Sequence, residues 1–211
     1  MTTLDAKLYD MRILWISFAI LLADQLSKLL VKGVSIPVLG VMIEGMQYGE
    51  SVHVLGDWLK ITYIENPYMA FGIDIAGKLF LVVFSFIAVI GILIFLYRNR
   101  QAAYPLRLSL AMILAGAIGN LLDRTFYGLM NDAPLFYGNV VDFIDLDLFT
   151  IQFSSSSFKF WPIFNIADAA VSVGVVLLLI VGIPREEKER AAENPSNPSV
   201  KPPGSDNPAH E

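Results

Sequence analysis

Four long apolar runs constrain the fold of this chain more than any other feature. They cover roughly residues 12–32, 77–97, 106–124 and 163–183. Each approaches the length of about 20 residues that an α-helix needs to cross a bilayer. Hydrophobic residues make up 55% of the sequence and charged residues only 17%, a balance that is unusual for a soluble domain. The runs therefore predict an all-α membrane protein with four transmembrane helices.

The distribution of lysine and arginine predicts how these helices are oriented. The short loop between the second and third runs is rich in arginine, with Arg98, Arg100 and Arg107. The two long connections, 33–76 and 125–161, hold one lysine each. Because cytoplasmic loops are enriched in positive charge, we expect both termini in the cytoplasm and both long connections on the outer face.

The first long connection is expected to contain a small extracytoplasmic β element. Residues 58–64 are rich in aromatic and β-branched side chains, which favour a strand, and residues 52–55 precede the turn signal Gly56-Asp57. Residues 1–183 are expected to form one membrane domain. The tail 184–211 is charged and rich in proline, so it is predicted to be disordered.

Composition excludes several classes of function. The net charge of −5 argues against a nucleic-acid partner, which requires a basic face. The chain has no cysteine, and its two histidines are His53 and His210. A thiol nucleophile, a histidine-based triad and a histidine-rich metal site are therefore not expected, and no cofactor is predicted.

The polar residues of the apolar runs are predicted to meet at one end of the bundle. With the expected topology, the outer helix ends hold Asp24, Lys28, Asn120, Asp123, Arg124, Asn165 and Asp168. Asp24 and Lys28 are four residues apart and can pair on one helix face. Two small-xxx-small pairs, Ala115/Gly119 and Ala170/Gly174, favour close contact between the third and fourth helices.

Carboxylates are the main acid–base groups available at this end. Asp168 is a candidate functional residue by default, because a carboxylate at the mouth of a membrane helix is costly to bury. Two neighbouring carboxyl groups share a proton, which allows general acid–base hydrolysis. From the residues alone, both Asp123 and Asp142 can be the partner of Asp168, although the adjacent Arg124 favours a structural role for Asp123.

Other interpretations remain open at this stage. The acidic cluster could move ions in a small transporter, although no internal repeat is visible. Lys28 near Ser27 could form a Ser/Lys hydrolase site, although adjacent helix residues do not face each other. A run of three acidic residues could bind magnesium or calcium and consists of Asp142, Asp145 and Asp147.

Five sequence blocks occur in an order typical of one family. They are Asp24-Gln25-Leu26-Ser27-Lys28, Asn66-Pro67-Tyr68-Met69-Ala70-Phe71-Gly72, Gly116 to Arg124, Val140-Val141-Asp142-Phe143-Ile144, and Phe164-Asn165-Ile166-Ala167-Asp168. With these blocks, over roughly residues 12 to 183, the chain resembles the bacterial lipoprotein signal peptidases (signal peptidase II).

The resemblance implies a metal-free aspartyl endopeptidase of the bacterial inner membrane, with its active site near the outer face. Such an enzyme cuts prolipoproteins just before a diacylglyceryl-modified cysteine, works among membrane lipids and is inhibited by globomycin-type cyclic peptides. The resemblance places catalysis on Asp142 and Asp168. It implies further substrate-binding or site-supporting residues, namely Asp24, Lys28, Asn66, Gly116, Asn120, Asp123, Arg124, Asn165 and Ala167.

Two departures from the family pattern are visible. Tyr68 and Met69 stand where the family usually has small residues. The segments that lead from Arg124 to Asp142 and from Asp142 to Asp168 are longer than is usual. Enlarged outer loops are expected there, around residues 131–134 and 154–157.

Overall fold

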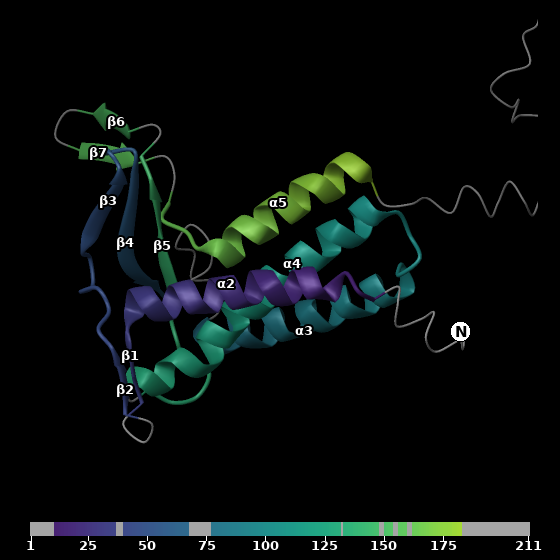
Figure 1. Cartoon of the computed structure of the whole chain (residues 1–211), viewed down its shortest axis with the longest axis horizontal. Coiled ribbons are helices and arrows are strands. Elements are labelled where there is room, and N and C mark those ends of the chain that lie inside the picture. Colours follow the sequence, from purple (N-terminus) through teal and green to yellow (C-terminus); the bar gives the residue numbers. More distant parts are fainter. Residues whose placement is uncertain are drawn as a thin grey trace, which may run out of the picture. The chain divides into compact units, whose positions relative to one another are not determined.

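Within the residues it describes, the computed structural model places helices α2 to α5 side by side, with small β-sheets gathered at one end (Figure 1). It describes residues 11–36, 40–67, 77–131, 133–147, 150–153, 156–159 and 162–182. The departure at Tyr68 and Met69 and the predicted tail 184–211 lie outside the described residues.

Three helices in the described part of the chain are long and apolar enough to cross a membrane. They are α2 (Leu14–Lys32), α3 (Gly77–Arg98) and α4 (Tyr104–Phe126), which continues into the 3-10 helix η3 (Tyr127–Asn131). Their bounds agree with the first three predicted spans to within about two residues. Candidate membrane-spanning helices are therefore present at these three predicted positions.

The fourth predicted span is shorter than expected. Helix α5 (Ile166–Val181) has 16 residues, which corresponds to about 24 Å of rise. It is uniformly apolar after Asp168 but falls below the usual spanning length. The fold class is thus confirmed as a membrane protein with at least three candidate spans, and the count of four stays a prediction.

The predicted β hairpin is present and belongs to a larger sheet. Strand β3 (Ser51–Leu55) pairs antiparallel with β4 (Leu59–Asn66), as the sequence indicated. The sequence did not predict that β5 (Val140–Leu146) adds to the other side of β4, giving the order β3-β4-β5. Two further hairpins are formed by β1 (Val34–Ile36) with β2 (Val41–Ile43) and by β6 (Thr150–Phe153) with β7 (Ser156–Lys159). The second of these occupies the region expected to be an enlarged loop.

Helix α4 is the centre of the bundle, because α2, α3 and α5 all pack against it. Its most extensive contact is with α5, as the small-residue pairs predicted. Gly174 shows how close the two helices lie, since an added Cβ there would be 2.9 Å from the Ser109 carbonyl oxygen. Such close approach of backbones is typical of membrane helices that present small residues to each other.

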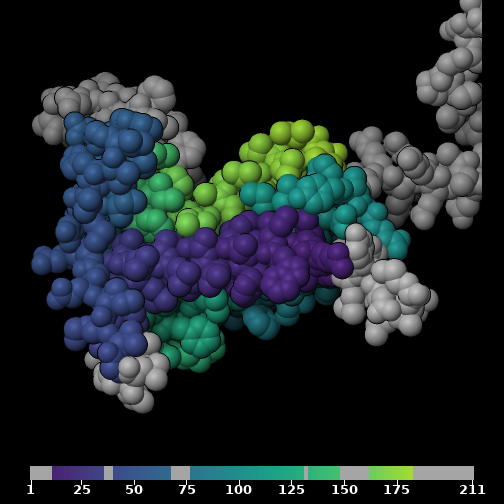
Figure 2. All heavy atoms as spheres, in the orientation of Figure 1, coloured from purple at the N-terminus to yellow at the C-terminus, as the bar shows by residue number. Residues whose placement is uncertain are grey.

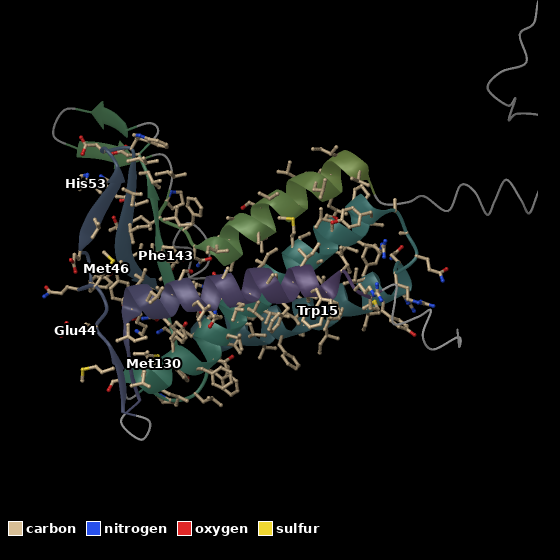
Figure 3. The ribbon with its side chains drawn as sticks, in the orientation of Figure 1. Trp15, Glu44, Met46, His53, Met130 and Phe143 are labelled. Carbon is tan, nitrogen blue, oxygen red and sulfur yellow. The ribbon has the colours of Figure 1, made fainter. Side chains whose placement is uncertain are left out.

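Two apolar clusters hold the two ends of the molecule. One joins α3 and α4 around Leu96, Leu106 and Leu114. The other joins the sheet to the end of α2 through residues that include Val31, Tyr63 and Phe143. Figure 3 shows Phe143 and Met46 at this sheet end, with Trp15 toward the opposite end of α2. In Figure 2 the blue atoms of the segment that contains β1 to β4 lie at one end of the purple helix α2.

Candidate active site

Lys28 is the centre of a fully buried polar cluster on the inner face of α2. Its ammonium lies 2.8 Å from Asp24 Oδ2, 2.7 Å from Asp123 Oδ2 and 3.1 Å from Asn120 Oδ1. All three ammonium protons thus have an acceptor. Asp24, Lys28 and Asp123 are each 0% exposed, and burial of such charges is tolerated when they are paired and hydrogen-bonded.

Gln25 completes this cluster, and sequence reasoning did not assign it a role. Its amide nitrogen lies 2.9 Å from Asp123 Oδ1 and 3.1 Å from Asp24 Oδ2. The Tyr127 hydroxyl donates to its amide oxygen at 3.3 Å. The signal that could have identified Gln25 is its position beside Asp24, inside the first of the five blocks.

Asn165 caps α5 and thereby fixes Asp168 at the start of this helix. The side-chain oxygen of Asn165 accepts a hydrogen bond from the Asp168 backbone N–H at 2.8 Å. The Ala167 N–H donates to Asp24 Oδ1 at 2.8 Å. Two of the N–H groups that a helix leaves unpaired in its first turn therefore have acceptors, and the short Asn-x-x-Asp spacing is explained by the cap.

The same asparagine links Asp168 to Asp142. Asn165 donates its side-chain N–H to Asp142 Oδ1 at 2.6 Å. Asn66, at the end of β4, donates to Asp142 Oδ2 at 3.2 Å. On the other side, Asn120 donates to Asp168 Oδ1 at 2.8 Å. Asn165 thus contacts both aspartates, while Asn120 contacts Asp168 and Asn66 contacts Asp142.

A backbone bridge brings β5 to the start of α5. Phe164 pairs with Ile144, with a hydrogen bond in each direction of 2.7 and 3.1 Å. The bridge places Asn165 beside Asp142 although 23 residues separate them along the chain. Asp142 itself is 2% exposed.

The environment of Asp142 favours its protonated form. Burial raises the pKa of Asp142, and the nearby Asp168 carboxylate raises it further, to about 7, although the hydrogen bonds from Asn66 and Asn165 oppose the shift. Among the described residues, neither Asp142 nor Asp168 forms an ion pair with lysine or arginine. The Asp142–Asp168 pair is therefore suited to hold a single proton near neutral pH.

Gly116 and Gly119 let α5 approach α4 closely enough to form this arrangement. An added Cβ at Gly116 would lie 2.2 Å from the Ala167 carbonyl oxygen, and one at Gly119 would lie 2.7 Å from Asp24 Oδ2. Ala167 is 0% exposed at this contact. A larger residue at any of these positions would separate the helix that carries Asn120 from the helix that carries Asp168.

The alternative chemistries find little support in the geometry. Ser27 donates to the Asp24 carbonyl oxygen of its own helix, while the Lys28 ammonium is surrounded by the acceptors given above. Asp145 accepts from Thr62 Oγ1 at 2.9 Å, and strand alternation directs it away from Asp142. Within the described ranges, no three His, Asp or Glu residues are grouped in a way that could hold a metal ion.

The structure therefore brings together the polar residues predicted from the sequence, in two adjoining groups. One surrounds Lys28 and the other surrounds the two aspartates. Arg124 lies between them, and its Nη1 donates to the Asn120 carbonyl oxygen at 3.3 Å. The geometry distinguishes the two candidate partners of Asp168, because Asp123 is ion-paired with Lys28 whereas Asp142 is bonded to amides.

Several known proteins are similar to this chain in sequence or in fold. A family model described as signal peptidase (SPase) II matches residues 16–183. The lipoprotein signal peptidase of Moorella thermoacetica is 36% identical over 169 residues, which cover 80% of this chain and 90% of that protein. That of Chlorobium phaeobacteroides is 34% identical over 163 residues, which cover 76% and 83%. A solved bacterial membrane enzyme, 26% identical, matches with a TM-score of 0.61 over 90% of this chain and 94% of its own.

Proposed function

This chain belongs to the signal peptidase II family of aspartic peptidases, and on that premise we propose that Asp142 and Asp168 are its catalytic pair. The reaction is the removal of signal peptides from prolipoproteins, by cleavage just before the diacylglyceryl-modified cysteine. The observation that supports this assignment best is the pair of carboxyl groups linked through Asn165 and Asn120, of which Asp142 is buried, with no ion pair from lysine or arginine to either among the described residues.

The raised pKa of Asp142 assigns the roles within the pair. With a pKa of about 7, caused first by burial and then by Asp168, Asp142 holds the shared proton in the resting enzyme. Asp168 is then the general base, which takes a proton from water as the water oxygen attacks the scissile carbonyl. Asp142 donates its proton to the carbonyl oxygen, which gives a neutral tetrahedral intermediate.

Collapse of the intermediate restores the pair. The carbonyl forms again as its hydroxyl proton returns to Asp142, and the proton on Asp168 passes to the departing amide nitrogen. The bond between the signal peptide and the cysteine breaks in this step. The asparagines hold the carboxyl groups in place throughout, so each step needs only proton movement between fixed groups.

The membrane environment is part of the proposal. The active site lies at the sheet end of the helices (Figure 1), and the arginines of the loop between α3 and α4 lie at the other end. The positive-inside rule therefore puts the site near the outer face of the inner membrane, with both termini in the cytoplasm. Exposed tryptophans, Trp15 at 71% and Trp58 at 50%, suit the two interfaces. We expect globomycin-type cyclic peptides to compete with substrate at the aspartate pair.

The test is cleavage of a diacylglyceryl prolipoprotein by the purified chain in detergent. Asp142→Asn and Asp168→Asn are each expected to reduce kcat by about 10³-fold or more, since each removes one acid–base group of a cooperating pair. Asp123→Asn is the matched control, because it changes a carboxylate with equal burial in the neighbouring cluster. It should keep activity within about tenfold.

Two results would contradict the proposal. One is an intact chain that does not cleave the lipid-modified substrate. The other is an Asp123→Asn variant that is as inactive as Asp142→Asn while both remain folded, because the assignment of Asp142 over Asp123 would then have no basis.

A further inference from the structure

Glu65 lies on the face of the sheet opposite to the catalytic aspartate. It is adjacent on β4 to Asn66, whose side chain contacts Asp142, and neighbouring strand residues point to opposite faces. On its own face, Glu65 is ion-paired with Lys32 and accepts a hydrogen bond from the Tyr63 hydroxyl at 2.7 Å. It also accepts one from the Asn139 side chain at 3.0 Å. The Lys32 and Glu65 side chains are 6% and 15% exposed.

These contacts are made beside the part of the sheet that holds Asp142. Strands β4 and β5 pair through Ile64 with Asp142, Glu65 with Val141 and Asn66 with Val140, and the register then shifts before Ile61. The catalytic end of the ladder therefore consists of three residue pairs. Glu65 lies within this short ladder. Asn139 directly precedes Val140, the first residue of β5, so the hydrogen bond from Asn139 to Glu65 links the two strands at this end.

Helix α2 connects this network to the other half of the site. Lys28 and Lys32 are one helical turn apart. Lys28 binds Asn120 and Asp123 of α4, and Asn120 binds Asp168. Lys32 binds Glu65 of β4. Two successive turns of α2 thus contact both halves of the site. Lys28 contacts the residues of α4, and Lys32 contacts the residue of β4.

Glu65 carries a negative charge in this setting. Burial would raise the pKa of Glu65, but the hydrogen bonds from Lys32, Tyr63 and Asn139 outweigh it, so the pKa lies below its ordinary value. The network continues to α3, because the Lys78 ammonium donates to Asn139 Oδ1 at 2.7 Å and to the Tyr137 carbonyl oxygen at 3.2 Å. The strand side is therefore attached to α2 and to α3 through charge-assisted contacts.

We propose that Lys32 and Glu65 are positioning residues that hold Asp142 in place against Asp168 by anchoring the end of β4 and β5 to helix α2. Neither residue reaches the reacting atoms. They act through Asn66 and the three residue pairs of the ladder. The inference rests on the proposed catalytic role of Asp142 and Asp168.

Direct substrate binding by the pair is the competing explanation. Lys32 and Glu65 line an open cavity of about 540 Å³, together with residues that include Glu44, Tyr48 and Met130. A residue that binds substrate in such a cavity affects KM, whereas a residue that positions a catalytic group affects kcat. The kinetic constants therefore separate the two roles.

The experiment compares Lys32→Met, Glu65→Gln and the double variant of the full chain in detergent, with the prolipoprotein substrate. Each single variant is expected to lower kcat about tenfold with KM changed less than about twofold. The double variant should lose no more than either single one, because the two residues act as a unit. Lys32→Arg keeps the charge and should retain most of the activity. Glu50→Gln is the matched control, since Glu50 is an exposed residue whose carboxylate accepts a hydrogen bond from the Gln47 backbone N–H.

The pH profile supplies a readout that loss of packing would not change. Asp142 is surrounded by Asp168, Lys28 and Arg124 as charged groups and by Asn66 and Asn165 as donors. The Asn66 hydrogen bond lowers the pKa of Asp142, so weakening it should raise that pKa. The limb of the kcat profile that belongs to the aspartate pair should therefore move to higher pH, by about half a unit, in Lys32→Met and Glu65→Gln.

The inference fails if folded Glu65→Gln cleaves with the kcat and pH profile of the unmodified chain, if the loss appears in KM, or if the losses in the double variant multiply. The unmodified chain is active in each of these outcomes, so they differ from failure of the proposed function, in which it would not cleave at all.

Discussion

The two groups of carboxylates at the sheet end of the bundle differ in what surrounds them, although Asp24, Asp123 and Asp142 are all buried. Asp24 and Asp123 face the Lys28 ammonium at 2.8 and 2.7 Å. Asp142 faces amide donors, and burial together with Asp168 raises its pKa to about 7. The first group has fixed charges that hold helices together. In the second group, the proposed mechanism needs a proton that can move. Burial of a carboxylate therefore does not by itself separate the two proposed roles, and the neighbouring charges have to be considered as well.

The largest expected effect outside catalysis is the loss of the cation in the first group. Lys28→Met leaves two anions without their partner in a buried site, so the free energy of unfolding should fall by about 3–5 kcal/mol. Asp123→Asn in the same chain removes one of the two anions and should restore part of this loss. Unfolding in a denaturing detergent, followed by tryptophan fluorescence, measures both variants. A Lys28→Met variant as stable as the unmodified chain would show that the first group does not hold the helices.

Sequence patterns predicted the helix bundle well because the apolar runs and their small residues act locally. The bounds of α2, α3 and α4, the β3–β4 hairpin and the contact of α4 with α5 all follow from spacing along a single segment. Helices α2, α3 and α4 can be predicted without knowing what they pack against, because length and hydropathy suffice.

The site was less predictable because its contacts join distant segments. Spacing alone left both Asp123 and Asp142 as candidates. They differ only after β5 joins β4 and after Phe164 bridges to Ile144, and neither pairing has a local signal. The Lys32–Glu65 ion pair escaped notice for the same reason, as it spans 33 residues. In contrast, the Asn165 cap could be inferred from its spacing to Asp168.

The close contact between α4 and α5 should have a smaller effect and links the two groups. Gly116→Ala places a methyl carbon only 2.2 Å from the Ala167 carbonyl oxygen. The helices must separate, which should lower the free energy of unfolding by about 1–3 kcal/mol and reduce kcat, because Asn120 and Asp168 lie on opposite sides of the contact. Gly91→Ala on α3 is the matched control, since an added Cβ there has no neighbour within 4 Å. That variant should be neutral or slightly stabilising, by about 0.5–1 kcal/mol. Equal effects of the two substitutions on unfolding would contradict the role of the contact.

The pH dependence of stability also distinguishes the two groups. Asp142 has a pKa of about 7 in the folded chain and an ordinary value of about 3.9 when unfolded. Between these values the unfolded chain releases a proton that the folded chain keeps, so stability falls as the pH rises and levels off above the folded pKa. Asp142→Asn removes this dependence. Its stability relative to the unmodified chain should therefore increase from pH 4 to pH 7, on the order of 3 kcal/mol, and stay constant at higher pH. Unfolding measured across this range tests the prediction, with Asp57→Asn as a control at a side chain that is 94% exposed. A difference between Asp142→Asn and the unmodified chain that does not vary with pH would mean that Asp142 is ionised throughout, and the proton would then have to reside on Asp168.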